Sequence, residues 1–162
     1  MKRTIASHTS PHGYFEDFEV GARMRHARST TISEAESQLL TKLVMNTADG
    51  HFNAEKFPKG GPFPNRLVFG LLTGSLVIGL ATQDTAEQAL AEVALDGLRF
   101  LSPVVPGDTL TAYSEILAAD EAEREDAGLV RFKHWGLKQD GTVVFEGERT
   151  VLVKRRSHWA DR

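Results

Sequence analysis

The segment NTADGHFNAE, residues 46–55, surrounds His51 with side chains that could take part in proton transfer. A histidine has an unperturbed pKa of about 6.5, so it can accept or donate a proton near neutral pH. Asp49 could supply a carboxylate two residues earlier, whereas the Asn46 amide could position a water molecule but not accept its proton. A histidine in a polar loop is more often structural than catalytic, and Asp49–Gly50 is also typical of a turn. The segment alone therefore leaves an acid–base site and a surface loop open.

A second candidate for chemistry is the start of the apolar stretch Leu67–Ala81, which predicts one long buried helix beginning near residues 68–70. A helix N-terminus presents backbone N–H groups that can stabilise an oxyanion, and Gly70 would let a substrate come close. A glycine in a helix interior costs about 1 kcal/mol relative to alanine. Close approach of another backbone could offset this cost at Gly70, Gly74 and Gly79, so packing alone explains Gly70 equally well.

The composition predicts one globular domain. The chain has 162 residues, 41% hydrophobic and 25% charged, which is enough to bury a core. Its net charge of −3 gives no reason to expect nucleic acid or an anionic membrane as a partner. The apolar stretch is short for a membrane span, the N-terminus lacks the apolar core of a signal peptide, and there is no cysteine, so we expect a cytoplasmic protein. No metal site is expected, because the other histidines show no metal-binding spacing.

Residues 32–46 predict an amphipathic helix ahead of the polar segment. Ser33 and Glu36 stand at the spacing of a capping box, in which each side chain caps the backbone of the other. An apolar stripe follows at helical spacing, formed by Leu39, Leu40, Leu43 and Val44. Residues 85–93 suggest a further short helix.

Most of the remaining chain predicts antiparallel strands. Residues 94–104 lead through the turn at Pro106–Gly107–Asp108 into a second strand, and Asp140–Gly141 marks a hairpin of two strands within residues 129–155. The direction in which residues 129–135 face is not evident from their pattern. With an early strand over residues 22–31, the sequence predicts an α+β fold of about five antiparallel strands and one central helix.

Four segments resemble the MaoC-like hydratases and dehydratases, hot-dog-fold proteins that add water to CoA thioesters or remove it. These segments are YFEDFEVG near the start, MNTADGHFNAE, NRLVFGLLTGSLVIGL and LRFLSPVVPGDTL, and they occur in the family's order. The resemblance covers residues 14–154 and is most specific for the subgroup with mesaconyl-CoA and itaconyl-CoA hydratases. It implies a hot-dog domain over residues 14–154, between a flexible N-terminal tail (residues 1–13) and a C-terminal tail (residues 155–162).

The family's active-site motif, Asp-x-Asn-Pro-x-His followed by x-Asp, is only partly kept. The motif's histidine falls on His51, its leading aspartate on Asn46 and its trailing aspartate on Asn53. The resemblance therefore implies a catalytic His51 that lacks its usual carboxylate. Three interpretations stay open: Asp49 replaces that carboxylate, His51 acts alone as base while Asn46 holds the water, or the protein binds thioesters without hydrating them. The second is favoured, because the spacing of the motif is intact.

The resemblance also implies a substrate-binding set. The family often has His-Gly where this chain has Phe69–Gly70, which assigns Gly70 as the oxyanion donor and Phe69 to the substrate pocket. Asn53 and Arg66 are further substrate-binding candidates. Arg66, or Arg99 from a half-buried position in a strand, could hold a second carboxylate of the substrate, although an arginine at such a position is more often an ordinary salt-bridged or snorkelling side chain.

The function implied is a hydro-lyase acting on a short enoyl-CoA or 3-hydroxyacyl-CoA thioester, with branched and dicarboxylic acyl groups included. The alternatives are a hot-dog acyl-CoA thioesterase and a non-catalytic acyl-CoA-binding protein. No metal or redox cofactor is implied, since CoA arrives as part of the substrate. The resemblance further implies a homodimer or higher homo-oligomer, with the active sites near the subunit interface.

Overall fold

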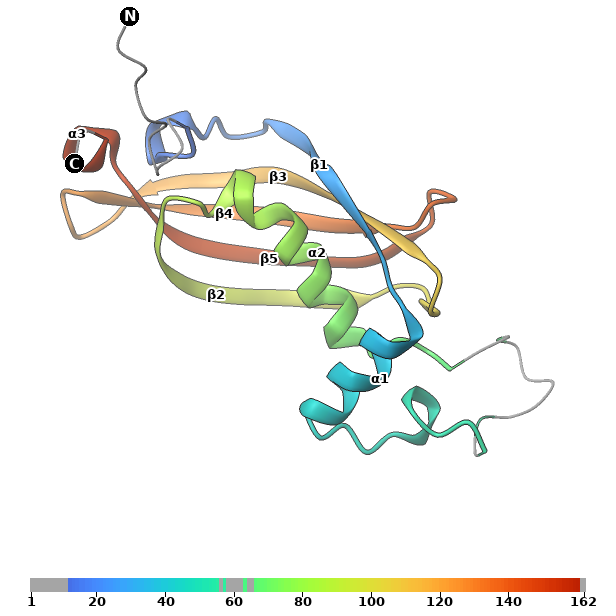
Figure 1. Cartoon of the computed structure of the whole chain (residues 1–162). Coiled ribbons are helices and arrows are strands. Elements are labelled where there is room, and N and C mark those ends of the chain that lie inside the picture. Colours follow the sequence, from blue (N-terminus) through green and yellow to red (C-terminus); the bar gives the residue numbers. More distant parts are fainter. Residues whose placement is uncertain (1–11, 56, 58–62, 64–65, 161–162) are drawn as a thin grey trace, which may run out of the picture.

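A five-stranded antiparallel sheet curves around one long helix (Figure 1). The computed structural model describes residues 12–55, 57, 63 and 66–160. The spatial order of the strands is β1-β3-β4-β5-β2, so β1 and β2 form the two edges of the sheet. The predicted α+β architecture is confirmed. The strands are β1 (Arg23–Thr31), β2 (Ala89–Phe100), β3 (Thr109–Glu121), β4 (Ala127–Leu137) and β5 (Val143–Lys154).

Two predicted turns connect the strands as expected. Gly107 has a φ of 98° between β2 and β3, and Gly141 has a φ of 84° between β4 and β5. These are left-handed backbone conformations that favour glycine. Across β4, whose facing was not evident from sequence, Val130, Phe132 and His134 are buried, and the alternate residues point to the other face.

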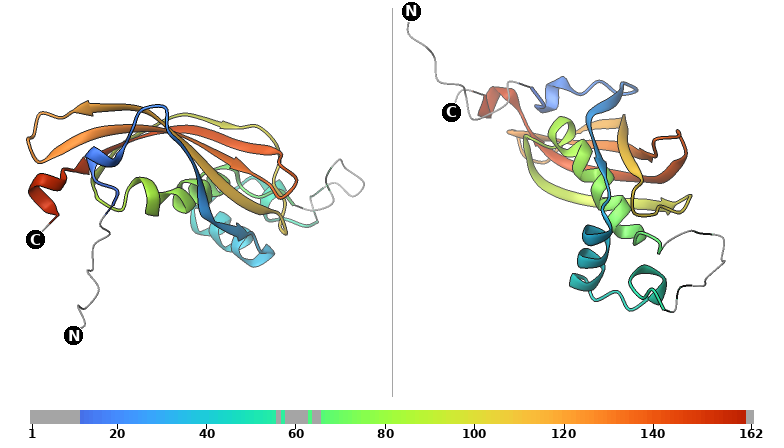
Figure 2. Two further views of the ribbon diagram at one scale, coloured as in Figure 1. Left: turned by 90° about the horizontal axis from the view of Figure 1, so that it is seen from above. Right: turned by 45° about the vertical axis from the view of Figure 1, so that its right-hand side comes forward.

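The central helix, α2 (Gly70–Thr85), crosses the concave face of the sheet (Figures 1 and 2). A Cβ added at Gly74 would lie 2.8 Å from the Phe145 ring of β5, so this glycine is required by close packing. The partner is a side chain rather than the backbone that we expected. The expectation for Gly79 is wrong, since a Cβ there would meet nothing within 4 Å.

The short helix expected over residues 85–93 is also wrong. From Ala89 onward this segment is β2, which pairs with β5 in the register Ala89↔Val153 and Ala91↔Leu152. Its alanine and glutamate residues favour a helix locally. Pairing with a long, regular neighbouring strand overrides this weak preference.

Helix α1 (Glu34–Leu43) lies beyond the end of the sheet (Figure 1). The predicted capping box is confirmed: the Glu36 N–H donates to Ser33 Oγ at 3.2 Å, and the Ser33 N–H donates to Glu36 Oε2 at 2.8 Å. Ser37 and Thr41 form the buried side of α1, whereas the predicted apolar stripe is exposed in the single chain. The exposed fractions of the stripe are Leu39 59%, Leu40 36%, Leu43 67% and Val44 59%.

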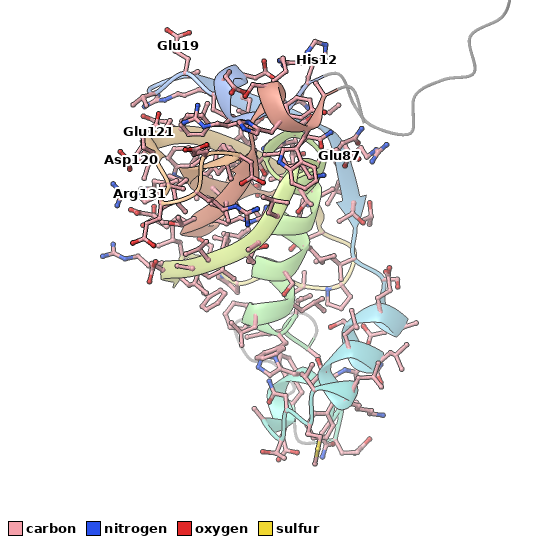
Figure 3. The ribbon with its side chains drawn as sticks, turned by 90° about the vertical axis from the view of Figure 1, so that its left-hand side faces the viewer. His12, Glu19, Glu87, Asp120, Glu121 and Arg131 are labelled. Carbon is pink, nitrogen blue, oxygen red and sulfur yellow. The ribbon has the colours of Figure 1, made fainter. Side chains whose placement is uncertain are left out.

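The first and last described segments of the chain lie close together at the end of the molecule opposite α1, where Figure 3 labels His12 and Glu19. The expected C-terminal tail includes a short helix, α3 (Arg156–Trp159). Arg156 pairs with Asp17 of the 3-10 helix η1 (Phe15–Asp17) at 2.5 Å. Residues 1–11 of the expected N-terminal tail lie outside the described residues. No helix in the described part of the chain has the length and apolar character to span a membrane.

Candidate active site

The backbone between α1 and α2 holds His51 in one orientation. His51 ends the 3-10 helix η2 (Asp49–His51), and the Leu67 N–H donates to the Gly50 carbonyl at 3.1 Å. The Leu67 carbonyl in turn lies 2.9 Å from His51 Nδ1. A carbonyl can only accept, so Nδ1 carries the proton of the neutral ring and Nε2 carries the lone pair. The half-buried imidazole is therefore held as the tautomer that can act as a base through Nε2.

His51 and Gly70 line the same cavity of about 200 Å³. The Phe69 ring packs beside the imidazole, with 5.7 Å between ring centroids. The other walls come from the segment before α2, the first turn of α2, the end of β2 and the start of β5. The remaining lining residues are Leu67, Val68, Thr73, Phe100, Leu101, Ser102, Pro103, Val104 and Val144.

Gly70 is the first residue of α2, and no side chain caps this end of the helix. The first N–H groups of a helix have no intrahelical acceptor, and the helix dipole adds partial positive charge there. A Cβ added at Gly70 would lie 3.2 Å from the Phe100 ring, which also lines the cavity. The absence of a side chain therefore keeps both the helix terminus and this wall open.

The polar neighbours of His51 in sequence do not all reach the cavity. Asn46 Oδ1 accepts from the Ala48 N–H at 2.9 Å, so this oxygen is used within its own turn. Asp49 Oδ1 accepts from Asn53 Nδ2 at 3.2 Å, within η2 and the turn that follows it. Among the described residues, none of the cavity's lining side chains is a carboxylate. The structure thus brings His51, Gly70 and Phe69 together, and it places Asn46, Asp49 and Asn53 in the supporting turns.

Arg66 joins the segment before α2 to the start of α1. Its guanidinium pairs with Glu34, whose Oε1 also accepts from Gln38 Nε2 at 2.8 Å. A contact between Arg66 and a substrate carboxylate would have to compete with this ion pair. The expectation that Arg99 is half-buried is wrong: 71% of its side chain is exposed, and it lies 3.7 Å from Glu146.

Sequence reasoning missed the walls of the cavity. Residues 100–104 were recognised only as part of a strand–turn motif, and Thr73 as part of a helix. Their apolar side chains look like ordinary core positions in the sequence. Only the curvature of the sheet around the first turn of α2 assembles them into one cavity.

A second polar cluster lies under the last turns of α2. His26 Nδ1 is 2.7 Å from Asp84, His26 Nε2 is 2.7 Å from Ser114 Oγ, and Ser114 Oγ is 2.6 Å from His134 Nδ1. His134 Nε2 is buried and has no hydrogen-bond partner among the described residues. Burial lowers the pKa of His134 to about 3, and the nearby charges of Arg149 and His26 add to this effect. His134 is therefore a neutral, buried histidine.

The comparisons with known proteins agree with the geometry. A family model described as mesaconyl-CoA hydratase matches residues 7–155. The chain belongs to this family. It is 33% identical to the β-methylmalyl-CoA dehydratase of Chloroflexus aurantiacus over 93% of this chain and 47% of the relative. A solved structure of a MaoC domain protein from C. aurantiacus J-10-fl superposes with a TM-score of 0.81 at 33% identity, covering 88% of this chain and 45% of that chain.

A Mycobacterium tuberculosis protein described as a double hot-dog fold is 22% identical and has a TM-score of 0.76, over 92% of this chain and 46% of that chain. This likeness shows the fold alone and confirms the hot-dog prediction. The chain spans about half the length of the curated relatives it matches. One hot-dog unit of this chain thus corresponds to about half of each of those proteins.

Proposed function

We propose that this protein is a hydro-lyase that adds water to an enoyl-CoA thioester or removes it from the corresponding 3-hydroxyacyl-CoA. The observation that carries the proposal is the hydrogen bond from His51 Nδ1–H to the Leu67 carbonyl, because it leaves Nε2 as a base in a cavity that also contains the first residue of α2. Membership of the mesaconyl-CoA hydratase family supports the same chemistry.

Each group in this cavity has a step to perform. In hydration, the thioester oxygen binds to the Gly70 N–H, which stabilises the negative charge that develops there. His51 Nε2 takes a proton from water as the water oxygen bonds to the β-carbon and the π electrons move to the thioester oxygen. The imidazolium then returns a proton to the α-carbon as the carbonyl reforms. Dehydration is the reverse sequence.

Asn46 is the group we assign to the water. Asn46 does not line the cavity and its oxygen is engaged with the Ala48 N–H, so its side chain would have to turn before the amide NH₂ group could donate to the water oxygen. An amide cannot share the proton-transfer work, so His51 alone is the base in this proposal. Asp49 is the alternative carboxylate, and its bond with Asn53 would have to rearrange for that role.

The substrate we propose is a short acyl-CoA. The cavity of about 200 Å³ is walled by Val68, Leu101, Val104 and Val144, which suit a small or branched acyl group. Phe69 packs against His51 and would limit the space beside the reacting carbons. If the acyl group is dicarboxylic, its second carboxylate would pair with Arg66, and the ion pair between Arg66 and Glu34 would then have to break.

We further propose that two copies of the chain associate through β2. This strand forms one edge of the sheet, and among its exposed side chains are Val93 and Leu95, 54% and 45% exposed. Phe100 and Leu101 are also about half exposed, and they line the His51 cavity. Pairing at this edge would cover apolar side chains and bring the second copy close to the active site. A cytoplasmic location remains part of this proposal.

One observation favours a second candidate, a non-catalytic acyl-CoA-binding protein. The described walls of the cavity contain His51 but no carboxylate, and a placed proton-transfer group is worth about 10²–10⁴-fold in rate. Loss of such a group without replacement would leave a pocket that binds thioesters and turns them over slowly.

The test is turnover of a panel of enoyl-CoA and 3-hydroxyacyl-CoA thioesters by the purified full chain. The conjugated double bond and free thiol are followed separately. The hydro-lyase changes the double bond without releasing thiol, and His51→Gln slows this change about 10²–10⁴-fold. Thiol release without any change in the double bond would identify the thioesterase instead. Saturable binding of the thioesters with no turnover would identify the binding protein.

A further inference from the structure

A second cavity lies on the face of the sheet opposite α2. It has a volume of about 380 Å³, and its lining residues include Arg23, Arg25, Tyr113, Trp135 and Leu137. In β3 the residues on either side of Tyr113, Ala112 and Ser114, are buried beneath α2, so Tyr113 points to the other face. The sheet therefore separates this cavity from the one that contains His51.

Strand β1 carries a bulge directly after the cavity residue Arg25. Arg25 pairs with Tyr113, and the next matched pair is Ser29 with Thr111, so three residues of β1 stand opposite one residue of β3. Such a bulge bends the strand and redirects its side chains. Arg25, the last residue paired before the bulge, is exposed on the outer face, and the next residue, His26, faces inward to Ser114.

Two aromatic side chains form one wall of this cavity. Tyr113 and Trp135 are directly opposite each other in the β3–β4 register, which places their Cβ atoms about 4.5–5.5 Å apart. Lys133 Nζ lies 5.3 Å from the centre of the Trp135 ring. The wall can therefore stack against a planar ring, whereas the charge of Lys133 is paired with Glu146 at 3.3 Å.

Of the two arginines that line this cavity, Arg23 is ion-paired and Arg25 is not paired with any described residue. Arg23 Nε lies 2.8 Å from Glu115, which neutralises its charge locally. The Arg25 side chain makes no ion pair or hydrogen bond with any of the described residues. An unpaired guanidinium beside an aromatic wall suits an anionic group attached to an aromatic ring.

We propose that this outer-face cavity binds a small, planar aromatic anion, with its ring against Trp135 and Tyr113 and its anionic group on Arg25. The proposal goes beyond the hydro-lyase function, because none of these residues lines the His51 cavity. A nucleoside monophosphate and an aryl sulfonate share the required chemistry, and the experiment separates them.

The two tryptophans of the chain provide a reporter and an internal control. Trp135 lines the cavity, whereas Trp159 Nε1 donates to the Asp126 carbonyl at the other end of the sheet. Titration of the ¹⁵N-labelled full chain with adenosine monophosphate, and separately with naphthalene-2-sulfonate, should shift the Trp135 indole resonance saturably. The Trp159 resonance should not move, and adenosine, which lacks the charge, should bind more weakly than its monophosphate. Whichever of the two anions binds more tightly distinguishes a nucleotide from another aromatic anion.

Arg25→Gln should weaken binding about tenfold or more, because it removes the charge-assisted contact. Arg28→Gln is the matched control: Arg28 is an exposed arginine of the same strand that does not line the cavity, and its loss should leave the affinity unchanged. The proposal is overturned if neither anion shifts Trp135 at millimolar concentration, if both tryptophans shift alike, or if the two arginine variants bind equally. None of these results depends on thioester turnover, so this experiment and the hydro-lyase assay test the two proposals independently.

Discussion

Histidines lie near both ends of α2, and they differ in how many of their ring nitrogens the protein itself occupies. At its N-terminus, half-buried His51 uses one nitrogen for the Leu67 carbonyl and keeps the other for a cavity. Near its C-terminus, His26 and His134 are each 1% exposed and share the hydroxyl of Ser114. The first arrangement fixes the orientation of the His51 ring through Nδ1 and leaves Nε2 available. The second commits nearly all of its hydrogen-bonding capacity to the protein.

The difference shows why the number of polar neighbours is a poor guide to a catalytic histidine. His26 has the more elaborate surroundings, with the Asp84 carboxylate on one nitrogen and Ser114 on the other. Ser114 is 1% exposed, however, and its hydroxyl is held between two imidazoles. A group can transfer a proton to a substrate only if one atom is both free and reachable, which His51 Nε2 satisfies.

The largest effect should come from His51→Gln. It should lower kcat/KM for the best thioester about 10²–10⁴-fold, equivalent to about 3–5 kcal/mol, because no other base is assigned to the water. The thermal midpoint should change little, since the side chain is half-buried and makes one hydrogen bond. Steady-state kinetics and calorimetry measure the two quantities. Full activity in this variant would show that His51 is not the base, and that His51, like His26, has only a structural role.

The buried cluster should instead determine how stability responds to acid. The pKa of His134 is about 3 in the folded protein and about 6.5 when unfolded, so below pH 6.5 the unfolded state binds more protons. The free energy of unfolding should therefore fall by about 1.4 kcal/mol per pH unit between pH 6.5 and 3, or about 2.7 kcal/mol by pH 4.5.

Urea denaturation of the wild type and of His134→Gln at pH 7 and 4.5 isolates this contribution, because the carboxylates titrate in both proteins. The groups around the ring are Arg149 from β5, paired with Glu92 of β2, and His26 from β1, paired with Asp84 of α2. The wild type should lose more stability than the variant. Equal losses would show that His134 accepts a proton in the folded state.

A third change tests whether the cluster is structural. Ser114→Ala removes the hydroxyl that His26 and His134 share, and it should cost about 1–3 kcal/mol of stability because both rings lose a buried partner. The kinetic constants per folded molecule should not change, since the cluster is separated from the His51 cavity along α2. Ser75→Ala is the control: this serine is exposed on the same helix and donates only to the Leu71 carbonyl. A larger effect on kcat than on stability would give the cluster a catalytic role.

The His51 site could be predicted from the sequence better than the buried His26–His134 cluster, because its parts depend on residues close together in the chain. The elements around His51 carry local signals: a capping box at Ser33, glycines at the strand turns and an apolar run after residue 66. His51 and Gly70 are separated in sequence by 19 positions, yet both lie in segments that a family motif marks. Asn46 and Asp49 instead bond within their own turns, and the sequence does not distinguish such side chains from His51.

The buried cluster has no such local signal. His26, Ser114 and His134 lie on three different strands, and they meet only when the registers of β1, β3 and β4 are known. The bulge of β1 between Arg25 and Ser29 depends on that pairing as well. Likewise, the β-strand from Ala89 was not recognised, because its local preference is helical and its conformation is imposed by β5.

The smallest predicted effect concerns Gly70, whose oxyanion role and packing role the sequence could not separate. In Gly70→Ala the new Cβ would stand 3.2 Å from the Phe100 ring, so the ring must move by a few tenths of an ångström into the cavity wall. We expect kcat/KM to fall about tenfold, which corresponds to about 1.4 kcal/mol, while alanine's better helix propensity offsets part of any loss of stability. Pairing Gly70→Ala with Phe100→Leu decides between the roles. If packing is the cause, the smaller residue at position 100 restores activity to the level of Phe100→Leu alone. If the methyl group itself keeps the thioester from the helix N-terminus, the double variant stays impaired.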